Sequence, residues 1–209
     1  MVKVAVTSRS FSRHPVLKFE LQQNYSSVTF NNGDSLRGDD LIDFLRDHDA
    51  AITALEPMTA AVFDAVPELR TLSKYGVGLD MIDISAMRDR GVKLGWTSGM
   101  NKRAVSELVI SMSISLLRHV PVANSEVRLG GWRQYKGREI SGRTFGIIGC
   151  GNIGKDLAVL LKAFGCGVLA YDIRDYHTFY EHHGIEAVDL ENLLTSAEIV
   201  SLHLPLDDN

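Results

Sequence analysis

Cysteine and long apolar runs are both scarce in this chain. Its 209 residues include two cysteines, too few for the disulfide framework of a small secreted protein, so we expect a reducing, cytoplasmic environment. No apolar run approaches the roughly 18 residues that a membrane-spanning helix needs. The sequence therefore predicts a cytoplasmic protein with no membrane partner.

Positive charge is not in excess either. The chain has 22 Lys and Arg residues against 26 Asp and Glu residues, which gives a formal net charge of -4. That balance argues against a nucleic-acid partner. With 45% hydrophobic and 23% charged residues, the composition is that of an ordinary globular protein, and the length allows one large domain or two small ones.

A glycine-rich motif is the most informative feature that is present. Residues 144–148 form a short apolar run typical of a strand, and a G-x-G-x-x-G motif follows it, beginning at Gly149. A helical pattern then leads to a second apolar run over residues 167–171, which ends at Asp172. This order of strand, glycine turn, helix, strand and acid is typical of a dinucleotide-binding unit.

Each residue type in the motif has a physical reason. Gly149 allows a tight turn out of the strand, Gly151 lets a pyrophosphate approach the backbone, and Gly154 lets the helix pack closely on the sheet. The pyrophosphate would lie at the helix N-terminus, where free N–H groups and the helix dipole favour an anion. The Asp172 carboxylate, 18 positions after Gly154, would bind the ribose hydroxyls and repel a 2′-phosphate. We therefore expect NAD rather than NADP as the cofactor.

Cys150 lies inside this turn and has two interpretations. A thiol near a helix N-terminus can have a lowered pKa and take part in redox chemistry. It can also be a small residue that fills space, and the sequence favours this second interpretation.

Apolar runs of strand type alternate with helical patterns along the chain, which predicts an α/β fold with parallel sheets. Residues 8–14 are polar and predict a loop. Residues 101–118 predict a long helix that is apolar around most of its circumference and therefore buried. Residues 122–144 are polar and predict a surface excursion that leads into the strand beginning at Thr144.

Five ordered motifs together resemble the D-isomer-specific 2-hydroxyacid dehydrogenases, and most nearly the phosphoglycerate-dehydrogenase-like members of that family. The resemblance runs through essentially the whole chain. The motifs are YGVGLDMID at residues 75–83, GVKLGWTSGMNKRAVSEL at 91–108, GRTFGIIGCGNIG at 142–154, YDIRD at 171–175 and SLHLPL at 201–206.

The resemblance implies a domain organisation and an activity. A flavodoxin-like substrate domain is expected over residues 1–98 and a Rossmann NAD-binding domain over residues 99–209, both doubly wound parallel sheets, with the active cleft between them. The implied activity is the NAD-dependent interconversion of a D-2-hydroxy acid, phosphoglycerate-like compounds included, and a 2-keto acid. Such an acid is the expected small-molecule partner.

The resemblance also assigns binding residues. Val77 and Gly78 would bind the substrate carboxylate through backbone N–H groups, and Val105 would pack near the nicotinamide. The loop at Leu204 and Pro205 would support the cofactor. The full set of residues expected to bind the cofactor is Val105, Gly149, Gly151, Asn152, Ile153, Gly154, Asp172, Leu204 and Pro205.

No catalytic residue is expected within the chain. The family's substrate-clamping Arg, its acid and its acid–base His all follow the HLPL segment, so the resemblance places them beyond Asn209. His203 matches the family's H-x-P segment and not the catalytic histidine. We expect a Rossmann domain truncated before its last strands and a chain that is inactive alone. The alternative is a catalytically incompetent NAD-binding regulatory or scaffold module.

We expect no bound metal, but we expect two copies of the chain to form a homodimer. The three histidines at positions 177, 182 and 183 have mixed helical spacing with no cysteine or clustered acid, which favours a solvated helix face over a metal site. The helix over residues 101–118 and the excursion over residues 130–136 favour a homodimer.

Three basic residues are considered as contacts for an anionic substrate. Arg9, in the loop after the first strand, is a hypothetical contact for a phosphate or carboxylate. Lys102 and Arg103 open the long helix just after a glycine-containing loop. They either attract an anionic substrate or are simply solvated, and the sequence does not decide between the two.

Overall fold

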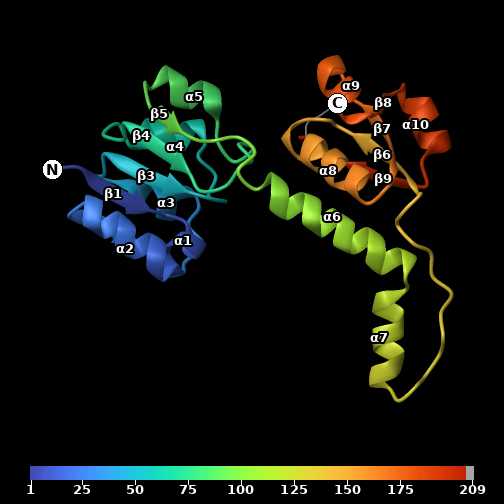
Figure 1. Cartoon of the computed structure of the whole chain (residues 1–209). Coiled ribbons are helices and arrows are strands. Elements are labelled where there is room, and N and C mark those ends of the chain that lie inside the picture. Colours follow the sequence, from blue (N-terminus) through green and yellow to red (C-terminus); the bar gives the residue numbers. More distant parts are fainter. Residues whose placement is uncertain (206–209) are drawn as a thin grey trace. The chain divides into compact units, whose positions relative to one another are not determined.

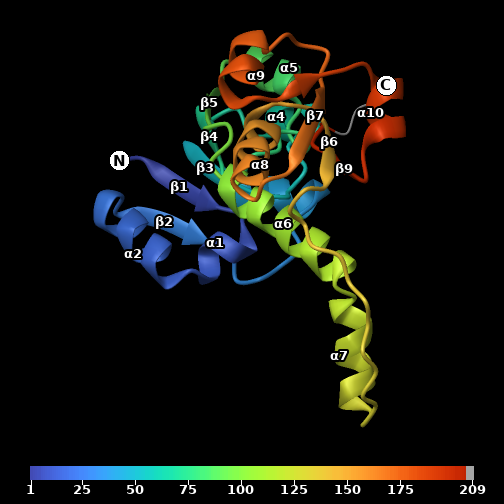
Figure 2. The same cartoon turned by 45° about the vertical axis from the view of Figure 1, so that its right-hand side comes forward.

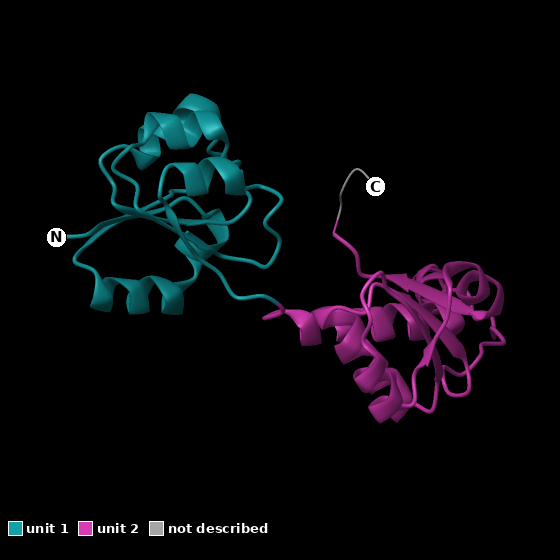
Figure 3. Cartoon of the chain, turned by 90° about the horizontal axis from the view of Figure 1, so that it is seen from above, with its two compact units in different colours: residues 1–98 teal, residues 99–209 magenta. Residues whose placement is uncertain are grey.

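The computed structural model describes residues 1–205, and the chain divides into two compact units, Met1–Ser98 and Gly99–Asn209 (Figure 3). Residues 206–209, which include the last residue of the SLHLPL motif, lie outside the described residues. Each unit has its own parallel sheet and its own hydrophobic core, so each buries its apolar residues internally.

The first unit contains a five-stranded parallel sheet in the order β2-β1-β3-β4-β5 (Figure 1). This is the flavodoxin-like strand order, which confirms the expected fold. The strands are β1 (Lys3–Val6), β2 (Ser27–Phe30), β3 (Ala50–Thr53), β4 (Thr71–Lys74) and β5 (Lys93–Gly95). The helices are α1 (Arg9–Arg13), α2 (Pro15–Asn24), α3 (Gly38–Leu45), α4 (Ala60–Ala65) and α5 (Ile84–Asp89).

The core of the first unit is built from buried residues of the sheet and of α3, α4 and α5. Leu41 and Leu45 lie one turn apart on α3 and are both fully buried, in one cluster with Phe63 of α4 and Leu72 of β4. Because the strands are parallel, the loops that follow β1, β3 and β4 lie together at the carboxyl edge of the sheet.

The second unit contains a four-stranded parallel sheet in the order β8-β7-β6-β9 (Figure 1). Counted along this unit the order is 3-2-1-4, the order of the first four Rossmann strands, which confirms the Rossmann-like fold. The strands are β6 (Thr144–Ile148), β7 (Gly167–Tyr171), β8 (Glu186–Ala187) and β9 (Ile199–Leu202). The helices are α6 (Lys102–Leu117), α7 (Val120–Arg128), α8 (Asn152–Ala163), α9 (His177–His183) and α10 (Leu190–Ser196).

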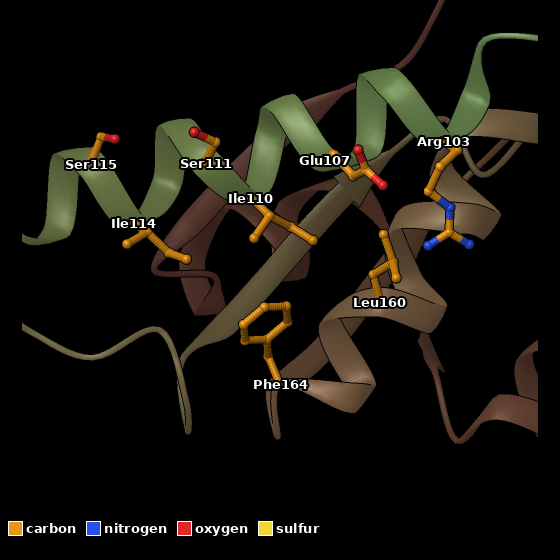
Figure 4. A pocket seen from close by; sticks show the side chains of 8 residues that line it. All are labelled: Arg103, Glu107, Ile110, Ser111, Ile114, Ser115, Leu160 and Phe164. Carbon is orange, nitrogen blue, oxygen red and sulfur yellow. The ribbon is translucent and has the colours of Figure 1, made fainter.

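The prediction that the long helix is buried is wrong. Only one face of α6 packs along α8, where it leaves a groove of about 440 Å³ beside Ile110 and Ile114 (Figure 4). The opposite face carries Leu108, Met112 and Leu116, which are between 54% and 72% exposed. Apolar residues all around a helix indicate that each face favours burial. They do not indicate which face another element covers.

The segments expected to form a loop and a surface excursion each contain a helix. Ser8 caps α1, and its hydroxyl accepts a hydrogen bond from the N–H of Phe11, so a polar segment begins a helix here. Residues 120–128 form α7, which extends away from the sheet of the second unit together with the segment that follows it (Figures 1 and 2). Among the described residues no single helix has both the length and the apolarity to cross a membrane, and α6 and α7 reach that length only as a pair bent by 63°.

Candidate functional site

The glycine turn between β6 and α8 has no room for side chains at two of its glycines. Gly149 has φ +92°, and a Cβ there would lie 2.6 Å from the carbonyl oxygen of His203. A Cβ on Gly154 would lie 2.3 Å from the carbonyl oxygen of Gly149. The N–H of Gly149 donates to the carbonyl of Tyr171 at 2.9 Å, which joins the turn to β7. Only glycine allows β6, α8 and β9 to meet so closely.

Gly151, by contrast, faces open space. Apart from Gly151 itself and the adjacent backbone, no heavy atom lies within 4 Å of the position that its Cβ would occupy. Gly151 is the N-cap of α8, a helix of 12 residues, and it has no side chain with which to cap the helix. The turn therefore offers an accessible helix N-terminus, a place that suits an anionic group such as a pyrophosphate.

Asp172 lies directly beside this turn, at the end of β7. Its Oδ2 accepts a hydrogen bond from the N–H of Cys150 at 2.6 Å, and its Oδ1 accepts one from the N–H of Arg174 at 2.8 Å. These two bonds fix the orientation of the carboxylate. Asp172, Arg174, Tyr180 and Val188 are among the residues that line a cavity of about 270 Å³.

The structure decides between the two interpretations of Cys150. The side chain is fully buried, and burial raises the pKa of its thiol. Burial also raises the pKa of the neighbouring Tyr180 hydroxyl, which contacts the thiol. The hypothesis that the Cys150 thiol has a lowered pKa is therefore wrong, and the side chain fills space beneath the turn.

The end of β9 closes the other side of the turn. The N–H of His203 donates to the carbonyl of Ile148 at 2.8 Å, and a Leu204 methyl group lies 2.7 Å from the position of a Cβ on Gly149. Pro205 is the last described residue. The His203 ring is within hydrogen-bond distance of the Ser201 hydroxyl, at 2.9 Å, and burial lowers its pKa.

The start of α6 lies over the start of α8. The Asn152 side chain occupies the space that a Cβ on Gly99 would need, at 2.8 to 2.9 Å, and the Ser106 hydroxyl lies 3.5 Å from the carbonyl oxygen of Ile153. Val105 is half-buried on the same turn of α6. Arg103 forms an ion pair with Asp156 of α8 at 3.0 Å, so its guanidinium has a partner within the second unit.

Val77 and Gly78 lie in the first unit, in the loop that follows β4. The carbonyl of Val77 accepts a hydrogen bond from the Trp96 indole N–H at 3.1 Å. Gly76 has φ +136°, and a Cβ on Gly78 would lie 2.6 Å from the Asp80 carboxylate. The loop is therefore tightly packed, and its shape depends on glycine.

The structure thus brings the glycine turn, Asp172 and Leu204 together within one unit and places Val77 and Gly78 in the other. Sequence reasoning did not single out Arg174 or Tyr180. The sequence does contain a signal for Arg174, because this residue lies two positions after Asp172. No local signal marks Tyr180, because it reaches the turn from α9.

Comparisons with known proteins agree with this arrangement. Residues 110–209 match the family model for the D-isomer specific 2-hydroxyacid dehydrogenase, NAD binding domain. Glyoxylate reductase from Korarchaeum cryptofilum is 35% identical over 175 residues, which cover 80% of this chain and 53% of that protein. D-3-phosphoglycerate dehydrogenase from Haemophilus influenzae is 33% identical over 174 residues, which cover 82% of this chain and 42% of that protein.

A solved structure extends the similarity to the whole fold. The pyruvate reductase of Chlamydomonas reinhardtii superposes with a TM-score of 0.82 at 26% identity, over 99% of this chain and 62% of that one. The chain spans about half the length of the curated relatives it matches. These matches show that residues 110–209 belong to the NAD-binding domain of the D-isomer specific 2-hydroxyacid dehydrogenase family, and that the chain as a whole is similar to members of that family.

Proposed function

We propose that the chain provides the NAD site and the substrate-carboxylate site of a D-2-hydroxyacid dehydrogenase, which interconverts a D-2-hydroxy acid and a 2-keto acid. The observation that carries the proposal is the glycine turn, where Gly149 and Gly154 are closed to side chains while Gly151 is open beside Asp172. This geometry fits a dinucleotide. When bound, NAD supplies the hydride acceptor.

The chain's own residues would bind and orient the two reactants. The pyrophosphate would lie on the N–H groups at the start of α8, next to Gly151, Asn152 and Ile153. The Asp172 carboxylate would accept hydrogen bonds from the adenosine ribose, with the adenine side in the cavity that Asp172 lines. Val105 would pack near the nicotinamide, and Leu204 and Pro205 would support the cofactor from the end of β9.

The substrate carboxylate would bind the loop after β4. The backbone of Val77 and Gly78 offers N–H groups, and glycines on this loop allow a small anion to approach the main chain. None of these residues is proposed to transfer a proton; they position the acid and the cofactor. Orientation of this kind lowers a reaction barrier by removing the entropy cost of bringing the reactants together.

The glycine turn gives the most direct test of the cofactor site. Gly151→Ala should keep the wild-type melting temperature, because its methyl group meets no atom within 4 Å beyond the adjacent backbone, yet should weaken NAD binding at least about tenfold by occupying the pyrophosphate position. Gly154→Ala should lower the melting temperature, since its methyl group meets the Gly149 carbonyl and overpacking of this kind costs about 1–3 kcal/mol. Calorimetric NAD titrations and thermal melts check both variants. Wild-type NAD affinity in Gly151→Ala would contradict the assignment.

Asp172 is expected to set the choice between the two nicotinamide cofactors. Asp172→Asn removes the charge that repels a 2′-phosphate but keeps a side-chain oxygen for one of its N–H partners. The preference for NAD over NADP should then fall by about tenfold, which corresponds to about 1.4 kcal/mol. The matched control is Glu186→Gln, an exposed acid on β8, which should leave the ratio of the two dissociation constants unchanged. An unaltered ratio in Asp172→Asn would remove Asp172 from this role.

We also propose that two copies of the chain associate through α6, α7 and the segment after α7. Leu129 and Trp132 in that segment are 89% and 91% exposed, and α6 exposes a further apolar row, so the region forms the kind of patch that a partner covers. Sedimentation velocity should give twice the 23.1 kDa of one chain. Leu129→Ser together with Trp132→Ser should yield the single mass, while Phe19→Ser, an exposed site on α2, should not. A single mass for the unaltered chain would overturn the dimer.

A further inference from the structure

A second cavity lies in the first unit, at the carboxyl edge of its sheet. It has a volume of about 280 Å³ and is formed where the segments after β1 and β3 meet. Ser8, Arg9, Ser10 and Arg13 line it from the β1 side, and residues 54–56 line it from the β3 side. Polar groups therefore face a space large enough for a small organic anion.

Two arginines are among the residues that line this cavity, and one Nη atom of Arg13 also lies 2.7 Å from the position that a Cβ on Gly33 would occupy. Arg9 and Arg13 are the first and last residues of α1, four positions apart, and both are exposed. Within residues 1–205 no carboxylate forms an ion pair with either of them. Like charges at this spacing repel each other, and an anion bound by both would remove that repulsion. Arginine suits the task, because its planar fork of N–H donors matches carboxylate and phosphate oxygens.

Glu56, the acid that also lines the cavity, forms hydrogen bonds within the fold. Glu56 is buried, and its Oε2 accepts hydrogen bonds from the hydroxyl of Thr7 at 3.0 Å, the hydroxyl of Thr53 at 3.1 Å and the N–H of Ala54 at 2.8 Å. These bonds hold the ends of β1 and β3 together. With two arginines against one carboxylate, the lining of the cavity keeps a net positive charge.

Direct contacts join this cavity to the loop proposed to bind the substrate carboxylate. The rings of Phe11 in α1 and Tyr75 after β4 meet edge to face, with centroids 5.2 Å apart. The Lys74 ammonium donates to the carbonyl of Ala54, and the N–H of Tyr75 donates to the carbonyl of Thr53 at 2.7 Å. Because β1, β3 and β4 are neighbours in the sheet, both features share one edge of the first unit.

We propose that Arg9 and Arg13 bind a second negative group of the substrate, while its first carboxylate lies on Val77 and Gly78. The substrate class is then a 2-hydroxy or 2-keto acid with a second carboxylate or a phosphate at its far end. This inference rests on the proposed function. It extends the single contact considered for Arg9 to a two-arginine subsite, and Arg13 enters only because α1 places it on the same cavity.

Trp96 provides an optical test, because its indole N–H bonds to the carbonyl of Val77. In the full chain carrying Trp132→Phe, Trp96 is the one remaining tryptophan, and its fluorescence reports on the loop. Titrations compare two matched pairs of ligands in the presence of NAD: 2-oxoglutarate against 2-oxovalerate, and D-3-phosphoglycerate against D-glycerate. The member of at least one pair that has two anionic groups should bind about tenfold or more tightly than its partner, and the pair that shows the difference distinguishes a carboxylate from a phosphate.

Variants locate the source of that difference. Arg9→Gln and Arg13→Gln should each reduce the advantage of the ligand with two anionic groups without changing the affinity of the ligand with one. Arg70→Gln, an exposed arginine at the start of β4 and thus at the opposite edge of the sheet, is the control and should change neither affinity. The advantage should also shrink as NaCl is raised, because both guanidinium groups are exposed to screening.

The possible outcomes separate this subsite from the carboxylate site on which it rests. Equal affinities within both pairs, or an advantage that survives in both arginine variants, would overturn the subsite and leave the carboxylate loop in place. If ligands with two anionic groups bind through the arginines while acids with one such group do not bind, the subsite is kept and the loop assignment is overturned. Failure of all four ligands to bind would overturn both.

Discussion

The close approach of three backbone segments at the glycine turn is the constraint on which the second unit depends. The carbonyl oxygen of Gly149 lies where a Cβ of Gly154 would be, and the carbonyl of His203 lies where a Cβ of Gly149 would be. Any side chain at these two positions would force β6, α8 and β9 apart. The same contact leaves the start of α8 uncovered at Gly151, and the hydrogen bond from Cys150 to Asp172 sets the acid beside it. The same close contacts therefore determine both the packing of the sheet and the shape of the cofactor site.

In the first unit a buried carboxylate has the corresponding role. Glu56 accepts three hydrogen bonds at the ends of β1 and β3. Its removal would take away the acceptor of the Thr53 hydroxyl and of the Ala54 N–H, which costs about 1–3 kcal/mol for each group left unsatisfied, whereas the Thr7 hydroxyl can still donate to the carbonyl of Ile52. Because this acid is occupied within the fold, the guanidinium groups of Arg9 and Arg13 remain available at the surface of the same cavity. At one edge of the sheet, the Glu56 carboxylate thus stabilises the fold, while the two arginines are available to bind a ligand.

Sequence reasoning reached the features that depend on local pattern and missed those that depend on neighbours distant in the chain. The alternation of strands and helices and the glycine motif follow from short runs and turn residues, whereas the flavodoxin-like and Rossmann folds were expected from the resemblance to the family. The burial of the helix over residues 101–118 could not be predicted, because Met112 and Leu116 point away from α8, and periodicity does not say which face is covered. The helix over residues 120–128 was missed because its composition is polar. Arg13 gained a role only when the fold placed α1 beside the end of β3.

The central claim is that NAD binds the accessible helix N-terminus at Gly151, next to Asp172. Titration of the ¹⁵N-labelled full chain with NAD, followed by NMR, tests it residue by residue. The account predicts that the largest changes in amide chemical shift fall on residues 149–154 and 172–174, and that they saturate together with a single dissociation constant. Amide shifts that leave both segments unchanged, or that are largest in the first unit, would contradict it.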